Sequence, residues 1–201
     1  MSLLFLGAFA APGAAQVVDQ SNYGATGYFG NANAWEGQTF RPKATTSAGA
    51  GFMVLNYGTA VTGTMTIQLW SGLASTPGAT MLASGTSSYS MLDFQTSMID
   101  VFWSAVAVAP GEEYFIAFNA NNANLHSLYS GDVYGGGQAG YNYSATDPTQ
   151  PYACCGAGYD LGFEEFSTSA VVATPEPASL ALLATGLLGI GGVARRRRTT
   201  A

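Results

Sequence analysis

Residues 63–72 read GTMTIQLWSG, and their apolar side chains recur at every second position. Met65, Ile67 and Leu69 therefore point to one face of an extended chain, while the polar residues between them point to the other. A period of two over this length is typical of a β-strand that packs one face on a core. The stretch predicts an all-β fold.

Similar segments fill the middle of the chain. Residues 112–120, EEYFIAFNA, are apolar at both alternating sets of positions, which predicts a strand buried on both faces. Turn signals such as Thr76-Pro77-Gly78 and Pro110-Gly111 separate the candidate strands. Further candidates are AGFMVLNYG (50–58), MIDVFWSAVAVA (98–109) and YDLGFEEFS (159–167). Short strands at regular spacing predict one antiparallel β-sandwich over residues 16–170.

The positive charge of the chain is concentrated at its end. Charged residues make up 9% of the sequence, and four of the six basic residues form the run Arg195, Arg196, Arg197 and Arg198. The rest of the chain is therefore strongly acidic and repels phosphate backbones. We expect no nucleic-acid partner.

The first 15 residues have the pattern of a secretory signal peptide. An apolar run from Leu3 to Ala11 is followed by small residues, with Gly13 and Ala15 placed as the minus-three and minus-one positions of a cleavage site. Such signals normally begin with basic residues, and none precedes this apolar run. Either the signal is weak or the true start codon lies upstream, and we expect the second.

Residues 171–201 form a second targeting segment with three parts. Pro175, Glu176 and Pro177 come first, then 17 uncharged residues at 178–194, then the arginine run at 195–198. A helix over 178–194 would barely span a hydrocarbon core of roughly 30 Å. Basic residues stay on the cytoplasmic side, so we expect the body of the chain on the outside.

This order and spacing resembles the PEP-CTERM sorting signal of Gram-negative bacteria. The resemblance implies that an exosortase recognises Pro175-Glu176-Pro177 while the helix holds the chain in the inner membrane in transit. It also implies a final location at the cell surface or in the extracellular matrix, in a bacterium that makes extracellular polysaccharide and biofilm. A simple C-terminal membrane anchor is the alternative, and it leaves the Pro-Glu-Pro motif unexplained.

The body more loosely resembles the jelly-roll ectodomains of surface-anchored bacterial proteins. The segments that carry this resemblance are QTFRP, TMTIQLWSG, PGATMLASG, VAPGEEYFIAF and DLGFEEF. The resemblance implies a sandwich shaped like a carbohydrate-binding module, and it supplies no catalytic residues.

Catalytic motifs are absent from the sequence. His126 is the only histidine, and neither a Gly-x-Ser-x-Gly elbow nor a two-histidine zinc motif occurs. The pairs Glu112-Glu113 and Glu164-Glu165 could supply glycosidase carboxylates, but Glu164 and Glu165 must face opposite sides of a strand. We interpret all four as solvated and expect no enzyme, with an unrecognised carbohydrate-active hydrolase as an alternative.

Cys154 and Cys155 are the only cysteines and are adjacent. Neighbouring Cα atoms lie about 3.8 Å apart, which is below the usual disulfide range. Three states are open, namely a vicinal disulfide, two free thiols, or cross-links to a partner. We prefer the vicinal disulfide.

Calcium is the one cofactor that the sequence brings into consideration. Asp19 lies near the first predicted strand and Asp160 opens the last, and a sandwich often brings its chain ends together. No Asp-x-Asp-x-Asp loop supports such a site. We expect no other metal and no organic cofactor.

Aromatic residues are the strongest ligand signal. Tyr and Trp rings in polar or glycine-rich surroundings can stack on sugar faces. The candidates are Trp35, Trp70, Tyr134, Tyr141, Tyr143 and Tyr152. The alternative for each ring is that it fills or covers the core. We predict a non-catalytic surface or matrix protein that contacts extracellular polysaccharide through these rings, with a structural matrix protein that has no defined ligand as the main alternative.

Overall fold

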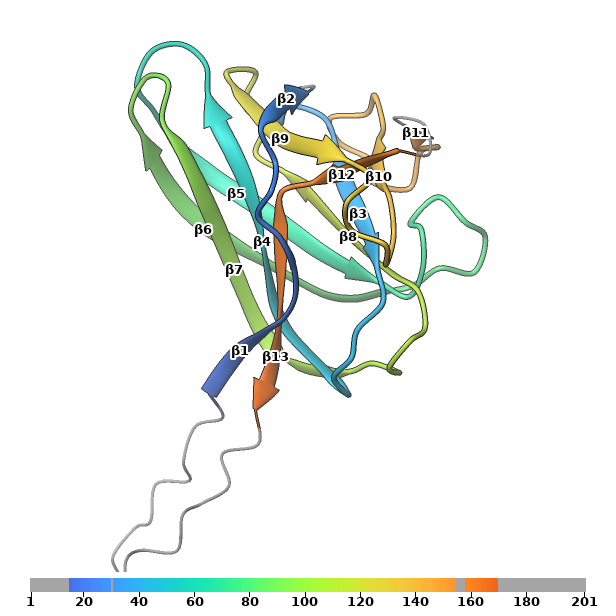
Figure 1. The fold of residues 1–201 in the computed structure, drawn as a ribbon. Helices are drawn as coiled ribbons and strands as arrows, with labels where there is room; N and C mark the ends of the chain where they lie inside the picture. Colours follow the sequence, from blue (N-terminus) through green and yellow to red (C-terminus); the bar gives the residue numbers. More distant parts are fainter. Residues whose placement is uncertain (1–14, 30, 155–157, 170–201) are drawn as a thin grey trace, which may run out of the picture. The chain divides into compact units, whose positions relative to one another are not determined.

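The computed structural model describes residues 15–29, 31–154 and 158–169, which form two antiparallel sheets (Figure 1). The first sheet has the order β1 (Ala15–Asn22), β13 (Phe163–Ser169), β4 (Thr46–Asn56), β9 (Leu125–Gly131) and β12 (Tyr159–Leu161). In the same sheet β2 (Gly27–Phe29) pairs with β9, and β7 (Thr96–Ala107) pairs with β4.

The second sheet has the order β11 (Ala153–Cys154), β10 (Ala139–Tyr141), β3 (Glu36–Phe40), β8 (Tyr114–Asn119), β5 (Val61–Trp70) and β6 (Met81–Met91). No helix occurs among the described residues, so none of them provides a helix long and apolar enough to cross a membrane. The predicted all-β fold is confirmed.

The main core lies between the two sheets. Met65, Ile67 and Leu69 of β5 are fully buried in it, as their period of two predicts. The ring of Phe52 on β4 stacks on that of Phe118 on β8, with ring centroids 4.3 Å apart. This contact joins the inner faces of the two sheets, which is the packing expected of a β-sandwich.

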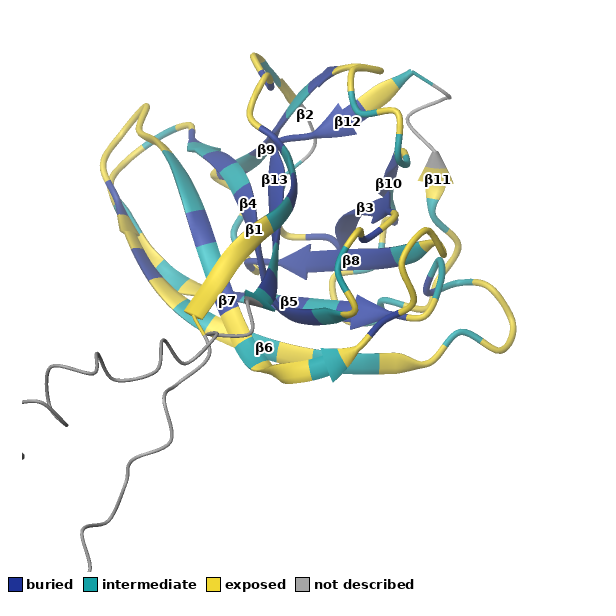
Figure 2. Ribbon diagram, turned by 60° about the horizontal axis from the view of Figure 1, so that its bottom comes forward, coloured by how far each residue is buried: buried dark blue, intermediate teal, exposed yellow. Residues whose placement is uncertain are grey.

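A second apolar cluster covers the outer face of the second sheet. Phe115 and Ala117 alternate with the core residues of β8, so they point outward, where they meet Trp35 and Trp70. Ala74, Leu73 and Ala79 from the 71–80 loop close over them. This cluster is why β8 is buried on both faces, as predicted, and why β3 and β8 are both drawn as buried in Figure 2.

The segment YDLGFEEFS does not form the single strand that its sequence predicts. It is divided at Gly162 into β12, which pairs with β9, and β13, which pairs with β4. The Gly162 amide donates to Leu128 O and its carbonyl accepts from the Met53 amide, both at 2.8 Å. A Cβ at this position would lie 2.8 Å from the Cβ of Met53, so the change of partner strand requires glycine here.

Candidate functional site

The loop after β10 is built by its own side chains. The fully buried Asn142 accepts from the Ser144 amide at 3.0 Å and donates to Asp147 O at 3.2 Å. The Asp147 carboxylate accepts from Thr149 and, at 2.7 Å, from Gln150 Nε2. These bonds hold the loop in one shape.

Tyr143 projects from this loop into solvent. Its side chain is 80% exposed, and its ring meets that of Tyr141 edge-on at a centroid distance of 4.9 Å. Tyr143 also lines an open hollow of about 460 Å³ together with Ser144, Gln150 and Pro151. We call this the Tyr143 hollow; its exposed ring can stack on the apolar face of a sugar, and the hydroxyl and amide beside it are of the kind that bind sugar hydroxyls.

The tryptophans among the predicted aromatic residues are not surface rings. Trp35 is 7% exposed and Trp70 is 8% exposed, and both lie in the second apolar cluster. Neither indole ring can stack on a ligand while the 71–80 loop covers this cluster.

Tyr152 and Tyr134 are half-buried. Tyr152 packs edge-on against Phe115 at 4.8 Å, and burial raises the pKa of its phenol. Tyr134 packs against Phe163 at 5.0 Å, and its hydroxyl donates to Gln20 Oε1 at 3.2 Å. Of the predicted rings, the structure therefore brings only Tyr141 and Tyr143 together at an exposed site.

The two calcium candidates already have protein partners. Asp160 is fully buried and accepts from Gln38 Nε2, from the Val133 amide and from the Tyr134 amide. Asp19 accepts from the amides of Lys43 and Ala44. Across the part of the chain that the structure describes, no three or more His, Cys, Asp or Glu side chains form a group that could hold a metal ion.

Several predicted features lie wholly or partly outside the described residues. Cys154 ends β11, opposite Gly140, whereas Cys155 is not described, so the vicinal disulfide stays a prediction. The signal segment up to residue 14 and the sorting residues at 175–177 and 195–198 are also outside.

The interpretation of Glu164 and Glu165 as solvated is wrong. They do face opposite sides of β13, but Glu164 is 8% exposed and Glu165 is fully buried. Burial raises the pKa of Glu165 to about 8. By contrast, Glu112 and Glu113 are exposed as predicted, and Glu113 pairs with Arg41 at 3.1 Å.

A second buried glutamate has no signal in the sequence. Glu36 on β3 lies in the core and accepts from Ser127 Oγ on β9, so it links the two sheets. Burial raises the pKa of Glu36 to about 8. Its local sequence, EGQTF, looks like that of a polar surface strand. The burial of Glu36 could not be predicted from it, because the partner Ser127 is 91 positions away.

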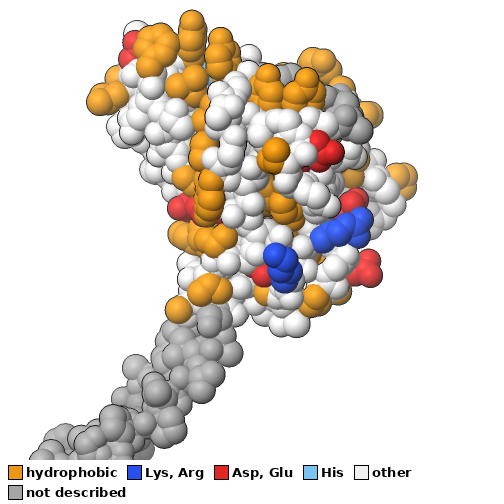
Figure 3. Space-filling model, in the orientation of Figure 1, with side chains coloured by type: hydrophobic (Ala, Val, Ile, Leu, Met, Phe, Trp, Pro, Cys, Tyr) orange, Lys and Arg blue, Asp and Glu red, His pale blue; other side chains and the backbone are white. Residues whose placement is uncertain are grey.

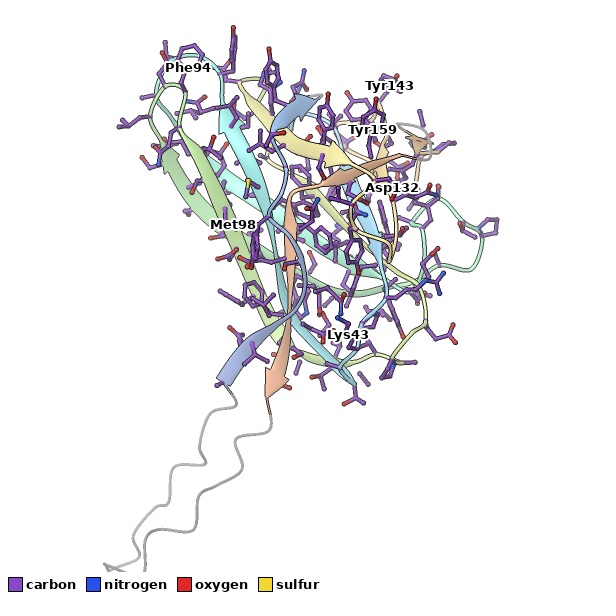
Figure 4. The ribbon with its side chains drawn as sticks, viewed as in Figure 1. Lys43, Phe94, Met98, Asp132, Tyr143 and Tyr159 are labelled. Atoms are coloured by element: carbon purple, nitrogen blue, oxygen red, sulfur yellow. The ribbon has the colours of Figure 1, made fainter. Side chains whose placement is uncertain are left out.

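The structure also contains a group of surface aromatic rings that the sequence does not predict. Tyr28 stacks on Tyr57 at 5.7 Å, Tyr57 meets Phe94 at 5.0 Å, and His126 contacts both tyrosines edge-on. These rings come from four separate segments, so no spacing in the sequence predicts their meeting. Figure 3 shows apolar side chains gathered at the upper left, over the end of the sheet where Figure 4 labels Phe94.

Comparison with known proteins bears on the end of the chain. Residues 173–198 match the family model described as the PEP-CTERM protein-sorting motif, and no curated protein sequence matches the chain. The match covers the Pro-Glu-Pro element, the apolar stretch and the arginine run in the order that the sequence predicts. The chain thus carries a PEP-CTERM protein-sorting motif at residues 173–198, and this motif implies an exported protein that an exosortase processes.

Proposed function

We propose that this protein is a non-catalytic component of the cell surface or extracellular matrix that associates with extracellular polysaccharide, the polymer of biofilms. In this proposal the segment at 178–194 holds the chain in the inner membrane until an exosortase has acted at 175–177. The Tyr143 hollow is the contact with the polysaccharide. The observation that supports it most is the 80% exposed ring of Tyr143 on a loop held by its own hydrogen bonds.

The charge of the body narrows the class of polysaccharide. Residues 15–169 contain eleven acidic residues against Arg41 and Lys43. An anionic polymer would be repelled by this excess of negative charge. The proposal is therefore specific to a neutral polysaccharide whose apolar sugar faces stack on Tyr143.

Co-sedimentation with the polysaccharide of the producing bacterium tests the proposal. Full-length wild-type protein, purified in detergent, should pellet with the polymer, and Tyr143→Ala should remain in the supernatant. Phe94→Ala is the matched control, since Phe94 is also exposed, at 63%, and lies at the opposite side of the view in Figure 4. Equal pelleting of wild type and Tyr143→Ala would refute the site.

The same samples distinguish the two alternative functions. A structural matrix protein without a ligand would leave all three proteins in the supernatant. A carbohydrate-active hydrolase would release reducing ends from the polymer over time, whereas the proposed binder releases none.

A further inference from the structure

Two acidic residues from different strands stand in one row across the first sheet. Glu164 on β13 is paired with Gly51 on β4, and Gly51 is paired with Asp100 on β7. Their chain neighbours Phe163 and Val101 point into the core. Glu164, Gly51 and Asp100 therefore share the outer face of the sheet.

Gly51 leaves the space in which the two carboxyl groups meet. A Cβ added to Gly51 would overlap Asp100 Oδ1 and would lie 3.2 Å from Glu164 Cγ. The two acidic side chains thus reach toward each other over the middle strand, at a place where burial, a hydrogen bond between the two carboxyl groups and the charge of Glu164 would all raise the pKa of Asp100. Two carboxyl groups can form such a bond only when one of them carries a proton.

Tyr23 adds a third member to the row. It lies between β1 and β2, and its hydroxyl donates to Glu164 Oε2 at 2.5 Å. The proton that holds Asp100 against Glu164 is retained up to neutral pH, because burial, the hydrogen bond with Glu164 and the charge of Glu164 raise the pKa of Asp100 to about 7. Burial raises the pKa of Tyr23 to about 12, so its hydroxyl stays a donor throughout the acidic and neutral range.

The side chains next to the row on β7 and β13 are apolar, and a further titratable group near Asp100 is Tyr89 on β6, which lines the same hollow and keeps its proton because burial raises its pKa. Phe102 on β7 and Phe166 on β13 lie on one side of it, with their rings 5.0 Å apart over Gly49, and Met98 lies on the other side. Ser21 is an uncharged polar residue near Tyr23. The charge state of the row is therefore decided by Asp100 and Glu164 themselves.

We propose that Tyr23, Glu164 and Asp100 form a proton-operated clasp on the outer face of the first sheet. With one proton shared between the carboxyl groups, the clasp ties β13 and the segment after β1 to β7 across β4. When that proton is lost above neutral pH, two negative charges face each other over Gly51 and the clasp loosens. Since β13 ends at Ser169 and the matched sorting motif begins at residue 173, the clasp sets how firmly the last strand before the motif is held.

The titration of Asp100 is the first test. In the purified full-length chain, the NMR shift of the Asp100 carboxyl carbon, followed from pH 3 to pH 9, should have its midpoint near 7. Glu164→Gln removes the facing charge and should move the midpoint toward the ordinary range of an aspartate. A wild-type midpoint near 4, or no change in Glu164→Gln, overturns the proposal.

Hydrogen exchange tests whether β13 is held less firmly after the shared proton is lost. Asp100→Asn cannot lose a proton, and its amide can still donate to Glu164. Above pH 7, amides of residues 163–166 in the wild type should exchange several-fold faster than those in Asp100→Asn, while the two proteins should match at pH 5. Comparing both proteins at the same pH cancels the intrinsic effect of pH on exchange. Equal exchange at pH 8.5 would contradict the clasp even if Asp100 titrates near 7.

Discussion

Gln38 and Asp160 join the two sheets of the sandwich: Gln38 Nε2 on β3 donates to Asp160 Oδ1 on β12 at 3.0 Å. The other Asp160 oxygen holds the loop after β9 through the amides of Val133 and Tyr134, at 2.9 and 2.7 Å. Gln38 Oε1 in turn accepts from the Leu161 amide at 2.9 Å. A polar network inside the core thus fixes both the distance between the sheets and one surface loop.

Asp160→Ala should lower the free energy of unfolding by about 3 kcal/mol, because it leaves three donors without their acceptor. Asp132→Ala is the matched control, since Asp132 is an exposed acid of the same loop. Urea denaturation of the two variants measures the difference. If the free energy of unfolding falls no further in Asp160→Ala than in Asp132→Ala, the network does not stabilise the fold as predicted.

Calcium should leave the thermal midpoint of the wild type unchanged. Both Asp160 oxygens and one oxygen of Asp19 are engaged by protein donors, so a cation would have to displace them. Thermal melts with added calcium and with a chelator check this. A rise of the thermal midpoint by several degrees with calcium would contradict this prediction and support a calcium site at Asp19 and Asp160.

Gly51→Ala should destabilise the fold by about 1–3 kcal/mol, because the new methyl group overlaps Asp100 and crowds Glu164. Gly131→Ala is a suitable control, since nothing lies within 4 Å of a Cβ at that position. Denaturation midpoints of both variants provide the comparison. Equal midpoints would show that the two carboxyl groups do not meet over Gly51.

The stability of the whole fold should fall as pH rises from acid toward pH 8. Burial raises the pKa of Glu36 and of Glu165 to about 8 in the folded chain, against an ordinary value of 4.5. Unfolding therefore releases protons between these two values, and the free energy of unfolding decreases with pH throughout that window. Thermal midpoints measured from pH 4 to pH 9 should decline, and Glu36→Gln and Glu165→Gln should each flatten the decline. A midpoint that rises from pH 5 to pH 8 would contradict the burial of these groups.

Much of the fold can be predicted from side-chain alternation, because burial on one face of a strand is a local property. The period of two at Met65, Ile67 and Leu69 predicts β5, and the continuous apolar run predicts β8. Whether an individual aromatic ring is buried or exposed could not be predicted in this way. Trp35 is buried in a cluster that draws residues from distant segments such as β8 and the 71–80 loop, whereas Tyr143 is left uncovered.

The buried acids illustrate the same limit. Glu165 follows Glu164 in a run that looks like a polar surface strand, yet the alternation of β13 places Glu165 among core side chains. Asp100 and Glu164 are 64 positions apart and meet only because β4 carries a glycine between them. Such meetings depend on strand order and register, which local patterns do not encode.

The sorting motif makes a prediction about processing in the cell. Replacing Pro175, Glu176 and Pro177 with alanine should leave unprocessed protein in the inner membrane fraction, because the element that an exosortase recognises is lost. Immunoblots of membrane and medium fractions, with wild type in parallel, measure this. Normal release of the alanine variant would mean that the motif is not used.

Calorimetric titration of the full-length protein with the neutral extracellular polysaccharide of the producing bacterium tests the central claim most directly. We predict saturable heat in the wild type and none in Tyr143→Ala, with no dependence on calcium. Heat that is absent from the wild type, or that persists unchanged in Tyr143→Ala, would contradict the assignment of the Tyr143 hollow as a polysaccharide site.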